Sequence, residues 1–308
     1  MKAKNQRLLV WLLGISLLLV GWRLPAGAEN KVSQLEARLT GQLAAIKDSL
    51  DGILGLAIKD LVTGKTIFIN ENEIFPQASS IKIAILMEVL KQAEENRLRL
   101  DDFVDLKPEN KVGGGPILNF LGNPSLRLSV HDLCVLMIVL SDNTATNLLI
   151  DLVGMEAVNR RLQVLGLNQT RLRRKMMDLK AAEEGRENIS TPREMLSLLE
   201  KIWQGKVLGA EQRQLFFDFL SLPKESPLQQ AVPDGVTVAD KPGELEAVRC
   251  DSGLVFLRKR PYIICVMTTY LGPREDGNAI IRKIGRLVYE HFDRLERSSE
   301  YGRIISER

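Results

Sequence analysis

Two groups of strand-like segments, separated by a long helical stretch, restrict how this chain can fold more than any other feature. Apolar patterns typical of strands occur within residues 53–70 and 236–271. Between these groups, before the first and after the second, apolar residues recur at helical spacing. Strands far apart in sequence can share one sheet, so we expect the two ends of the chain to form one α/β domain, with a helical domain inserted between them.

The patterns also give boundaries. We expect the α/β domain to comprise residues 29–74 and 224–308, and the inserted all-helical domain to comprise residues 75–223. The expected strands are residues 53–61, 65–70, 236–240, 247–257 and 262–271. The expected helices are residues 31–50, 79–90 (running on to about 96), 129–140, 143–152, 155–165, 191–203, 210–220 and 279–295. Residues 79–90 are apolar on nearly every side, which predicts a buried helix. The polar residues 178–188 predict a loop.

The N-terminus has the pattern of a signal peptide, which we assign to residues 1–28. Lys2, Lys4 and Arg7 precede the apolar run from Leu8 to Trp22, and Ala26-Gly27-Ala28 is a small-x-small cleavage pattern. The run is short for a membrane span, which needs about 20 residues. An uncleaved anchor is the alternative. Both interpretations predict an exported protein, periplasmic or secreted.

The charge of the remaining chain argues against polyanionic partners. Four of the 42 Lys and Arg residues lie in residues 1–28, so 38 basic residues face 39 acidic ones, a net charge of −1. This balance gives no electrostatic basis for binding nucleic acid or anionic lipid. We expect a monomer that meets a membrane only through an N-terminal segment that is not removed.

Cysteine and histidine usage narrows the chemistry. Cys134, Cys250 and Cys265 are an odd number for an exported protein, and a tight hairpin would place Cys265 opposite about Leu254, so we predict no disulfide. The chain has only two histidines, too few for a multi-histidine zinc site. They are His131 and His291, each in a helical pattern that favours a structural role. We expect no metal or cofactor, and a serine nucleophile would need a base other than histidine.

Such a base is offered by Ser79-Ser80-Ile81-Lys82, which opens the buried helix. Three-residue spacing places the serine and lysine on one helix face, beside a positive helix end. A lysine shielded from water can lose its proton near neutral pH and activate the serine. Taken alone, the motif is better explained by a serine N-cap followed by a surface lysine.

Two further short motifs follow in order. Ser141-Asp142-Asn143 lies at the junction of two expected helices, and Lys241-Pro242-Gly243 lies at the end of an expected strand. The alternative for the first is a helix-helix turn capped by Asp142 or Asn143. The alternative for the second is an ordinary strand end followed by a turn.

Together, the three motifs look like those of class A β-lactamases and penicillin-binding proteins. The resemblance extends over roughly residues 35–295 and includes Phe75-Pro76, Gly113-Gly114-Gly115 and Asp251-Ser252-Gly253. It implies an antiparallel sheet of about five strands flanked by the N- and C-terminal helices, with the active site between this α/β part and the inserted helices.

The resemblance also implies a role for each matching residue. Ser79 would attack a β-lactam or peptide carbonyl, and Lys82 would accept its proton or organise the relay. Ser141 would pass a proton to the leaving nitrogen, and Asn143 would orient Lys82 and contact the substrate. Lys241 would place positive charge near the substrate carboxylate. Gly243 would allow close approach of the substrate, and the amides of Ser79 and Glu244 would form the oxyanion hole.

The first departure from the family pattern concerns deacylation. Class A enzymes carry a loop glutamate and asparagine that activate water, but alignment on Arg174 and Leu179 places Met176 and Lys180 at those positions. A thioether cannot take a proton from water. Asp178 or Glu183 could replace the base only from a reshaped loop.

The loop also differs in its expected ion pair. Asn188 stands where the family usually has an aspartate that pairs with the loop arginine, so Arg174 would need another partner, such as Glu187.

The second departure is Pro242, where the family has serine or threonine. Proline lacks the hydroxyl that would bind a carboxylate and also lacks a backbone N–H. A proline within a strand further indicates a position at the edge of the sheet.

These features predict a β-lactamase-like serine hydrolase that acylates through Ser79 and deacylates slowly. The first alternative is a D-Ala-D-Ala peptidase-like or other cell-wall hydrolase. The second is a catalytically degenerate binding protein, against which the joint retention of the motif residues argues.

Overall fold

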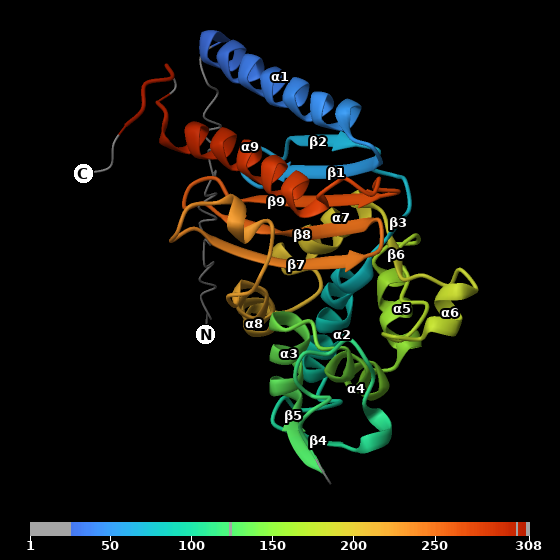
Figure 1. The fold of residues 1–308 in the computed structure, drawn as a ribbon. Coiled ribbons are helices and arrows are strands. Elements are labelled where there is room, and N and C mark those ends of the chain that lie inside the picture. Colours follow the sequence, from blue (N-terminus) through green and yellow to red (C-terminus); the bar gives the residue numbers. More distant parts are fainter. Residues whose placement is uncertain (1–25, 123–124, 300, 306–308) are drawn as a thin grey trace, which may run out of the picture.

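The computed structural model describes residues 26–122, 125–299 and 301–305. Its centre is, as expected, a five-stranded antiparallel sheet, and the strands lie in the order β2-β1-β9-β8-β7 (Figure 1). The strands are β1 (Ile53–Asp60), β2 (Thr66–Ile69), β7 (Thr237–Leu245), β8 (Val248–Phe256) and β9 (Tyr262–Thr269). The last strand pattern of the chain therefore returns to pair with the first, which joins the two ends of the chain in one sheet.

Helices cover both faces of this sheet (Figure 1). On one face, α1 (Ala26–Ser49) and α9 (Gly277–Arg297) bury apolar residues such as Leu43 and Ile284 against the strands. On the other face, α7 (Pro192–Trp203) packs on β1 and β9. The apolar core on that side continues without interruption into the remaining helices.

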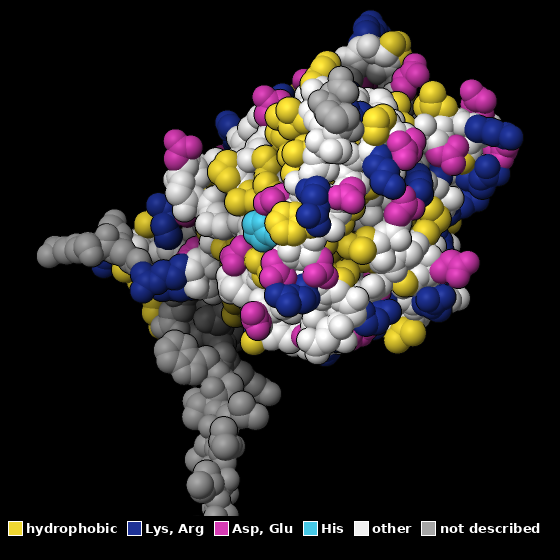
Figure 2. Space-filling view, turned by 90° about the horizontal axis from the view of Figure 1, so that it is seen from below, with side chains coloured by type: hydrophobic (Ala, Val, Ile, Leu, Met, Phe, Trp, Pro, Cys, Tyr) yellow, Lys and Arg dark blue, Asp and Glu magenta, His cyan; other side chains and the backbone are white. Residues whose placement is uncertain are grey.

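The surface charge and the N-terminal segment can both be compared with what the sequence predicts. Figure 2 shows basic and acidic side chains interspersed over one face, which fits the near-zero net charge of residues 29–308. Residues 1–25 of the expected signal peptide lie outside the described residues, and residues 26–28 form the first turn of α1. Within the described ranges, no helix is long and apolar enough to cross a bilayer.

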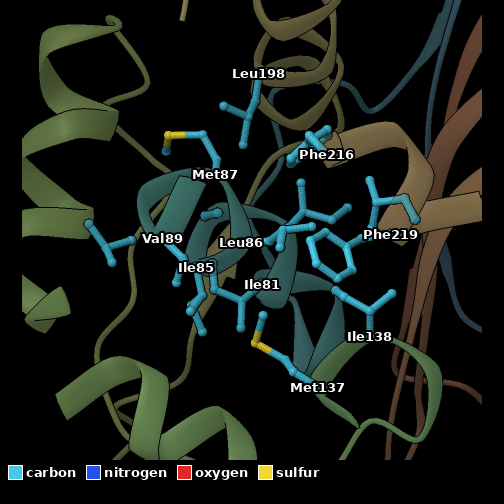
Figure 3. Close-up of a cluster of buried hydrophobic side chains, with 14 of the residues drawn as sticks. Ile81, Ile85, Leu86, Met87, Val89, Met137, Ile138, Leu198, Phe216 and Phe219 are labelled. Atoms are coloured by element: carbon cyan, nitrogen blue, oxygen red, sulfur yellow. The ribbon is translucent and has the colours of Figure 1, made fainter. Parts of the chain in front are cut away.

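The buried helix expected from the apolar run is α2 (Lys82–Glu94), which lies at the centre of the helical part and contacts the other helices around it. Its residues Ile85, Leu86 and Val89 are fully buried and meet side chains from several other helices, as Figure 3 shows. The surrounding helices are α3 (Val130–Val139), α4 (Asn143–Val153), α5 (Met155–Val164) and α8 (Ala210–Ser221). The first turn differs from the expectation, because residues 78–81 form the 3-10 helix η1 (Ala78–Ile81) and α2 begins at Lys82.

Several short elements have no counterpart in the sequence-based expectations. They are β3 (Phe75–Pro76) paired with β6 (Ile189–Ser190), β4 (Phe103–Leu106) paired with β5 (Leu126–Ser129), η2 (Pro108–Asn110) and η3 (Gln229–Ala231). The expected loop at 178–188 also contains the short helix α6 (Leu179–Glu183), whose first turn is capped by the Asp178 carboxylate. Elements of two to five residues are too short to show a period in the sequence.

Strand β7 corrects one expected boundary and confirms one expected position. We expected the strand to end at Asp240, but it continues to Leu245 and carries the Lys241-Pro242-Gly243 motif in its middle. It is the edge strand next to β8, as Pro242 indicated. An edge position tolerates the missing N–H of proline, since only one side of the strand needs to bond.

The register of the β8–β9 hairpin differs from the one expected for Cys265. Cys265 lies opposite Ser252 rather than Leu254, and Cys250 lies opposite Met267. The three cysteines are free and buried, which confirms the prediction of no disulfide.

Candidate active site

Ser79 lies on the turn between β3 and α2, and this turn is tightly held. Ala78 adopts a left-handed conformation with φ 45°, which is unfavourable for a residue with a side chain. The Ser80 hydroxyl and amide both donate to the carbonyl of Gln77, and the Gln77 amide donates to the Asn188 carbonyl. Backbone strain of this kind persists where surrounding contacts enforce it, and here it presents the half-buried Ser79 to a cavity.

Lys82 is fully buried at the start of α2, which excludes the surface lysine considered above. Its Nζ donates to the Ser141 carbonyl at 2.7 Å, to the Ser141 hydroxyl at 3.0 Å and to Asn143 Oδ1 at 3.3 Å. Burial, followed by the nearby charge of Lys241, holds the pKa of Lys82 well below its usual range, and Asp142 opposes the shift. A neutral Lys82 near pH 7 could accept a proton.

The Ser141-Asp142-Asn143 motif turns the chain from α3 into α4. Ser141 has φ 53°, and the Asp142 carboxylate caps α4 by accepting from the Ala145 amide at 2.9 Å. Asn143 is therefore the first residue of the helix rather than its cap. Its Nδ2 donates to the Gly113 carbonyl at 3.2 Å, which leaves Oδ1 facing Lys82. The cap thus fixes both polar side chains that meet the lysine.

Lys241 approaches the same hydroxyl from the sheet. Its Nζ lies 3.2 Å from the Ser141 hydroxyl and 3.0 Å from the Pro242 carbonyl, while its side chain is almost completely buried. Burial, followed by the charge of Lys224, lowers the pKa of Lys241 to about 8. With two lysines bonded to the Ser141 oxygen, its own O–H is available to a substrate.

Gly243 brings strand β7 into contact with the nucleophile turn. A side chain at this position would begin 2.6 Å from the Gln77 carbonyl oxygen and 2.8 Å from the Ser80 amide nitrogen, closer than real contacts allow. The next residue, Glu244, points its carboxylate to Arg249 rather than into the turn. This close approach places the two expected oxyanion-hole amides on neighbouring backbone segments.

One cavity of about 830 Å³ is lined by most of the predicted residues, although Lys82 and Asp178 are not among them. Ser79, Ser141, Asn143, Lys241, Gly243 and Glu244 all line it. Its size is that of a pocket for a drug-sized molecule. Gly114, from the glycine turn that the sequence resemblance included, and Pro116 next to this turn line the same cavity.

The loop after α5 places Met176 beside Ser79. Both residues line a smaller cavity of about 170 Å³, together with Asn143 and Glu187. The Met176 side chain is buried, and a thioether has no basic site for a water proton. Asp178, the candidate base in the sequence, lies outside both cavity linings and uses its carboxylate to cap α6. Glu183 also lies outside both linings.

The expected partner of Arg174 is confirmed. Arg174 bonds the Glu187 carboxylate at 2.8 and 3.2 Å, and its side chain is only 10% exposed. Asn188, at the position where the family usually has an acid, accepts from the amides of Arg173 and Arg174. Lys180, at the asparagine position of the family pattern, is exposed on α6. The loop therefore keeps an ion pair but lacks the water-activating pair.

The sequence did not single out Lys224, Asn278 and Arg282, which also line the larger cavity. Lys224 follows a proline in a polar segment and has the sequence signature of a surface lysine, yet its side chain is 1% exposed. Arg282 lies on α9, after the last of the three motifs and outside all of them. Nothing local in the sequence marks these residues, because tertiary packing alone brings them to the site.

Comparisons with known proteins agree with this geometry. A family profile described as the β-lactamase enzyme family matches residues 38–292. A β-lactamase of Streptomyces fradiae is 28% identical over 297 residues, covering 94% of this chain and 97% of the relative. An imipenem-hydrolysing β-lactamase of Enterobacter cloacae is 27% identical, covering 77% of this chain and 83% of the relative.

Solved structures show the same likeness. A mutant of the protein PBP-A, captured as an acyl-enzyme with penicillin G, has a TM-score of 0.74 and 28% identity, covering 85% of this chain and 97% of that one. An ancestral class A β-lactamase has a TM-score of 0.75 and 31% identity, covering 82% of this chain and all of that one.

Proposed function

The chain belongs to the β-lactamase enzyme family, in its class A group, and from this premise we propose that it forms an acyl-enzyme with β-lactams through Ser79 and releases the product slowly. The observation that carries the proposal is the convergence of Lys82, Ser141 and Lys241 beside Ser79. Ser141 and Lys241 line the same cavity as Ser79, and Lys82 is buried behind them, bonded to Ser141.

The proposed acylation begins at Lys82. In its neutral form, Lys82 takes the proton of the Ser79 hydroxyl, and the serine oxygen attacks the β-lactam carbonyl. The amides of Ser79 and Glu244 bind the oxyanion. As the C–N bond breaks, Ser141 donates its proton to the leaving nitrogen and is reprotonated through Lys82, to which it is bonded at 3.0 Å. Acylation thus leaves the lysine neutral again.

Slow deacylation follows from the buried Met176 beside Ser79. Hydrolysis of the ester needs a water molecule whose proton is taken by a positioned base. Loss of one such base typically costs a factor of about 10² to 10⁴ in rate. The carboxylates that line the small cavity are Glu187, held by Arg174, and Glu244, held by Arg249. Neither is an unpaired base, so the acyl-enzyme should accumulate.

A cell-wall peptide ending in D-Ala-D-Ala is the second candidate substrate. A cavity of about 830 Å³ is large enough for a peptide stem, and its cation Lys241 could attract a terminal carboxylate. Acylation by such a peptide would break the terminal amide bond and release D-alanine. The same residues would act, so the two candidates differ in the leaving group rather than in the machinery.

The proposed location is outside the cytoplasm, with residues 1–28 acting as a signal peptide. Its support is the basic, apolar and small-residue order of the N-terminal sequence. N-terminal sequencing of the protein from its native host should begin at about Glu29, and an intact Met1 would indicate a retained anchor. We further propose a monomer, which light scattering would test.

Intact-mass spectrometry with benzylpenicillin tests the acylation step. We expect one covalent adduct, mapped by proteolysis to the peptide containing Ser79, and no adduct in Ser79→Ala. Ser80→Ala is the matched control, since it removes a neighbouring hydroxyl that bonds Gln77, and it should still acylate. An adduct that survives in Ser79→Ala would refute the assignment. A chain that retains a ligand without any adduct would be a binding protein.

A further inference from the structure

A buried lysine that the proposed mechanism does not use lies behind Lys241. The Lys224 side chain is 1% exposed, and its Nζ lies 3.1 Å from Asp240 Oδ1, whose carboxylate is fully buried. The same ammonium donates to the carbonyls of Leu220 and Leu222. A buried lysine is costly unless it is paired and hydrogen-bonded, and all of these donors are directed to acceptors.

Asp240 is the residue before Lys241 in β7, and it is the carboxylate nearest in sequence to that lysine. Its oxygens are occupied by Lys224, by the Ser226 hydroxyl and by Gln229 Nε2 at 3.0 Å. Side chains of consecutive strand residues point to opposite faces, so Asp240 is directed to this network while Lys241 is directed to Ser141. Lys224 is therefore the cation that pairs with Asp240.

The second buried acid of the network does not supply a compensating charge. Asp251 on β8 lies across from Pro242, with its carboxyl 2.9 Å from the Ser226 hydroxyl oxygen, and accepts from the Leu228 amide at 3.1 Å. Burial, followed by the neighbouring charge of Asp240, holds the pKa of Asp251 well above its usual range. In its protonated form Asp251 is neutral, so one ammonium and one carboxylate remain behind Lys241.

We propose that Lys224 is a positioning residue for acylation: its pairing with Asp240 offsets the charge of that carboxylate on the opposite face of β7, so that the carboxylate does not hold the proton on Lys241, whose Nζ contacts the Ser141 hydroxyl. This inference rests on the proposed function. It assigns Lys224 no contact with the reacting atoms, because the residue acts through Asp240 and Lys241.

The electrostatics of the neighbouring lysines agree with this arrangement. After burial, the charge of Lys224 is the largest effect lowering the pKa of Lys241 to about 8, whereas the charge of Asp240 raises it. Lys241 in turn contributes to the lowered pKa of Lys82. The three lysines are thus coupled in series from the buried network to the nucleophile.

Other charged groups face the cavity from elements outside this series. They are Glu225 after α8, Glu244 on β7 and Arg282 on α9, and the buried Asp142 before α4 acts on Lys82 from outside the cavity lining. Asp142 is engaged as a helix cap, and Glu244 is paired with Arg249. Lys224 and Asp240 therefore remain the charges whose substitution most directly changes the surroundings of Lys241.

The pH dependence of the acylation rate constant for benzylpenicillin provides the test. If the charged form of Lys241 is required, wild-type acylation declines as the pH rises through about 8. Lys224→Met leaves Asp240 free to stabilise the Lys241 ammonium, so its decline should move upward by about one pH unit. Lys224→Arg keeps the charge and should retain the wild-type profile. Lys59→Met, which breaks the partly buried pair between Lys59 on β1 and Glu200 on α7, is the matched control.

Two further variants allow the inference to be tested even if Lys224→Met does not fold. The double variant Lys224→Met/Asp240→Asn removes both charges and should return the decline to near the wild-type pH. Asp240→Asn alone leaves Lys224 uncompensated, so its decline should move to lower pH. Identical declines in wild type and in whichever of these variants fold would overturn the inference.

A titration without substrate separates this inference from the proposed function. The Lys241 Cε signal of ¹³C-lysine-labelled protein, assigned with Lys241→Arg, should titrate near pH 8 in wild type and at higher pH in Lys224→Met. If wild type forms no adduct at any pH but the signal shifts as stated, the proposed function fails. The effect of Lys224 on the charge of Lys241 then still stands. An unshifted signal contradicts the role of Lys224, whatever the enzyme acylates.

Discussion

Met176 and Asn147 exchange two hydrogen bonds: the Met176 amide donates to Asn147 Oδ1 at 2.8 Å, and Asn147 Nδ2 donates to the Met176 carbonyl at 3.0 Å. Both bonds use the backbone of Met176, so they are independent of its side chain. The position is therefore held beside Ser79 in a geometry that another side chain could inherit. Position 176 of the loop is therefore suitably placed for a basic group, but Met176 does not provide one.

Met176→Glu should for that reason accelerate deacylation. A carboxylate at this position can accept a proton from water in the small cavity, and a positioned base typically contributes about 10² to 10⁴ in rate. We expect at least a tenfold shorter lifetime of the benzylpenicillin adduct, measured by time-resolved intact mass, with acylation still dependent on Ser79. Ala182→Glu adds the same charge to the same loop away from the cavity and should leave the lifetime unchanged. Equal lifetimes in both variants would show that position 176 does not face the hydrolytic water.

Pro242→Thr should improve the use of substrates that carry a carboxylate. The change restores a hydroxyl and an N–H on an edge strand, where it removes no existing bond of the sheet. A hydrogen bond to a charged group is worth about 1.5–3 kcal/mol, so acylation efficiency for benzylpenicillin should rise about tenfold or more. The methyl ester of the same penicillin is the control substrate and should gain little. A similar gain for acid and ester would mean that the hydroxyl acts on something other than the carboxylate.

The Arg174–Glu187 ion pair should hold the loop in place. Glu187→Gln leaves a guanidinium that is 10% exposed without its charge partner, so we expect a loss of unfolding free energy on the order of 1 kcal/mol, since the Glu187 side chain is partly exposed. Arg186→Gln breaks the more exposed pair with Glu184 and serves as the matched control, with little effect expected. Denaturant unfolding of both variants makes the comparison. Losses of equal size would indicate that the Arg174 pair adds no more than an ordinary surface pair.

The buried Lys82 should lower the stability of the folded protein, and the size of this loss should depend on pH. Its folded-state pKa is lowered, so the unfolded chain binds more protons at pH values between that lowered value and the ordinary lysine pKa of about 10.4. The stability of wild type relative to Lys82→Met should therefore rise as the pH is increased from 7 to about 10. Thermal unfolding of both proteins across this range is the measurement, and a constant difference in Tm would contradict a shifted Lys82. Lys82→Met should also fail to acylate.

Local patterns were enough to predict the features of this chain that depend on neighbours in sequence. The apolar run after Ser79 predicted the buried helix, and the spacing of Ser79 and Lys82 brought both to its N-terminal end. Pro242 predicted the edge strand, because its missing N–H excludes the interior of a sheet.

Features that depend on tertiary packing could not be predicted in the same way. Lys224 has the sequence pattern of a surface residue, and only the fold encloses it beside Asp240. Asp178 had the right chemistry in the right loop, but the formation of α6 directs its carboxylate to a helix cap. Strand β7 extends past its apolar residues because pairing with β8 continues through the polar motif.

The lifetime of the benzylpenicillin adduct on the wild-type protein is the measurement that tests the central claim most directly. Protein and penicillin would be mixed, excess penicillin removed, and the intact mass followed while the released product is quantified. We predict an adduct on Ser79 that forms readily and persists for many minutes to hours, with product appearing at the rate at which the adduct is lost. A wild-type protein that hydrolyses many equivalents of penicillin per second with no detectable adduct would contradict slow deacylation and require a base that Met176 does not replace.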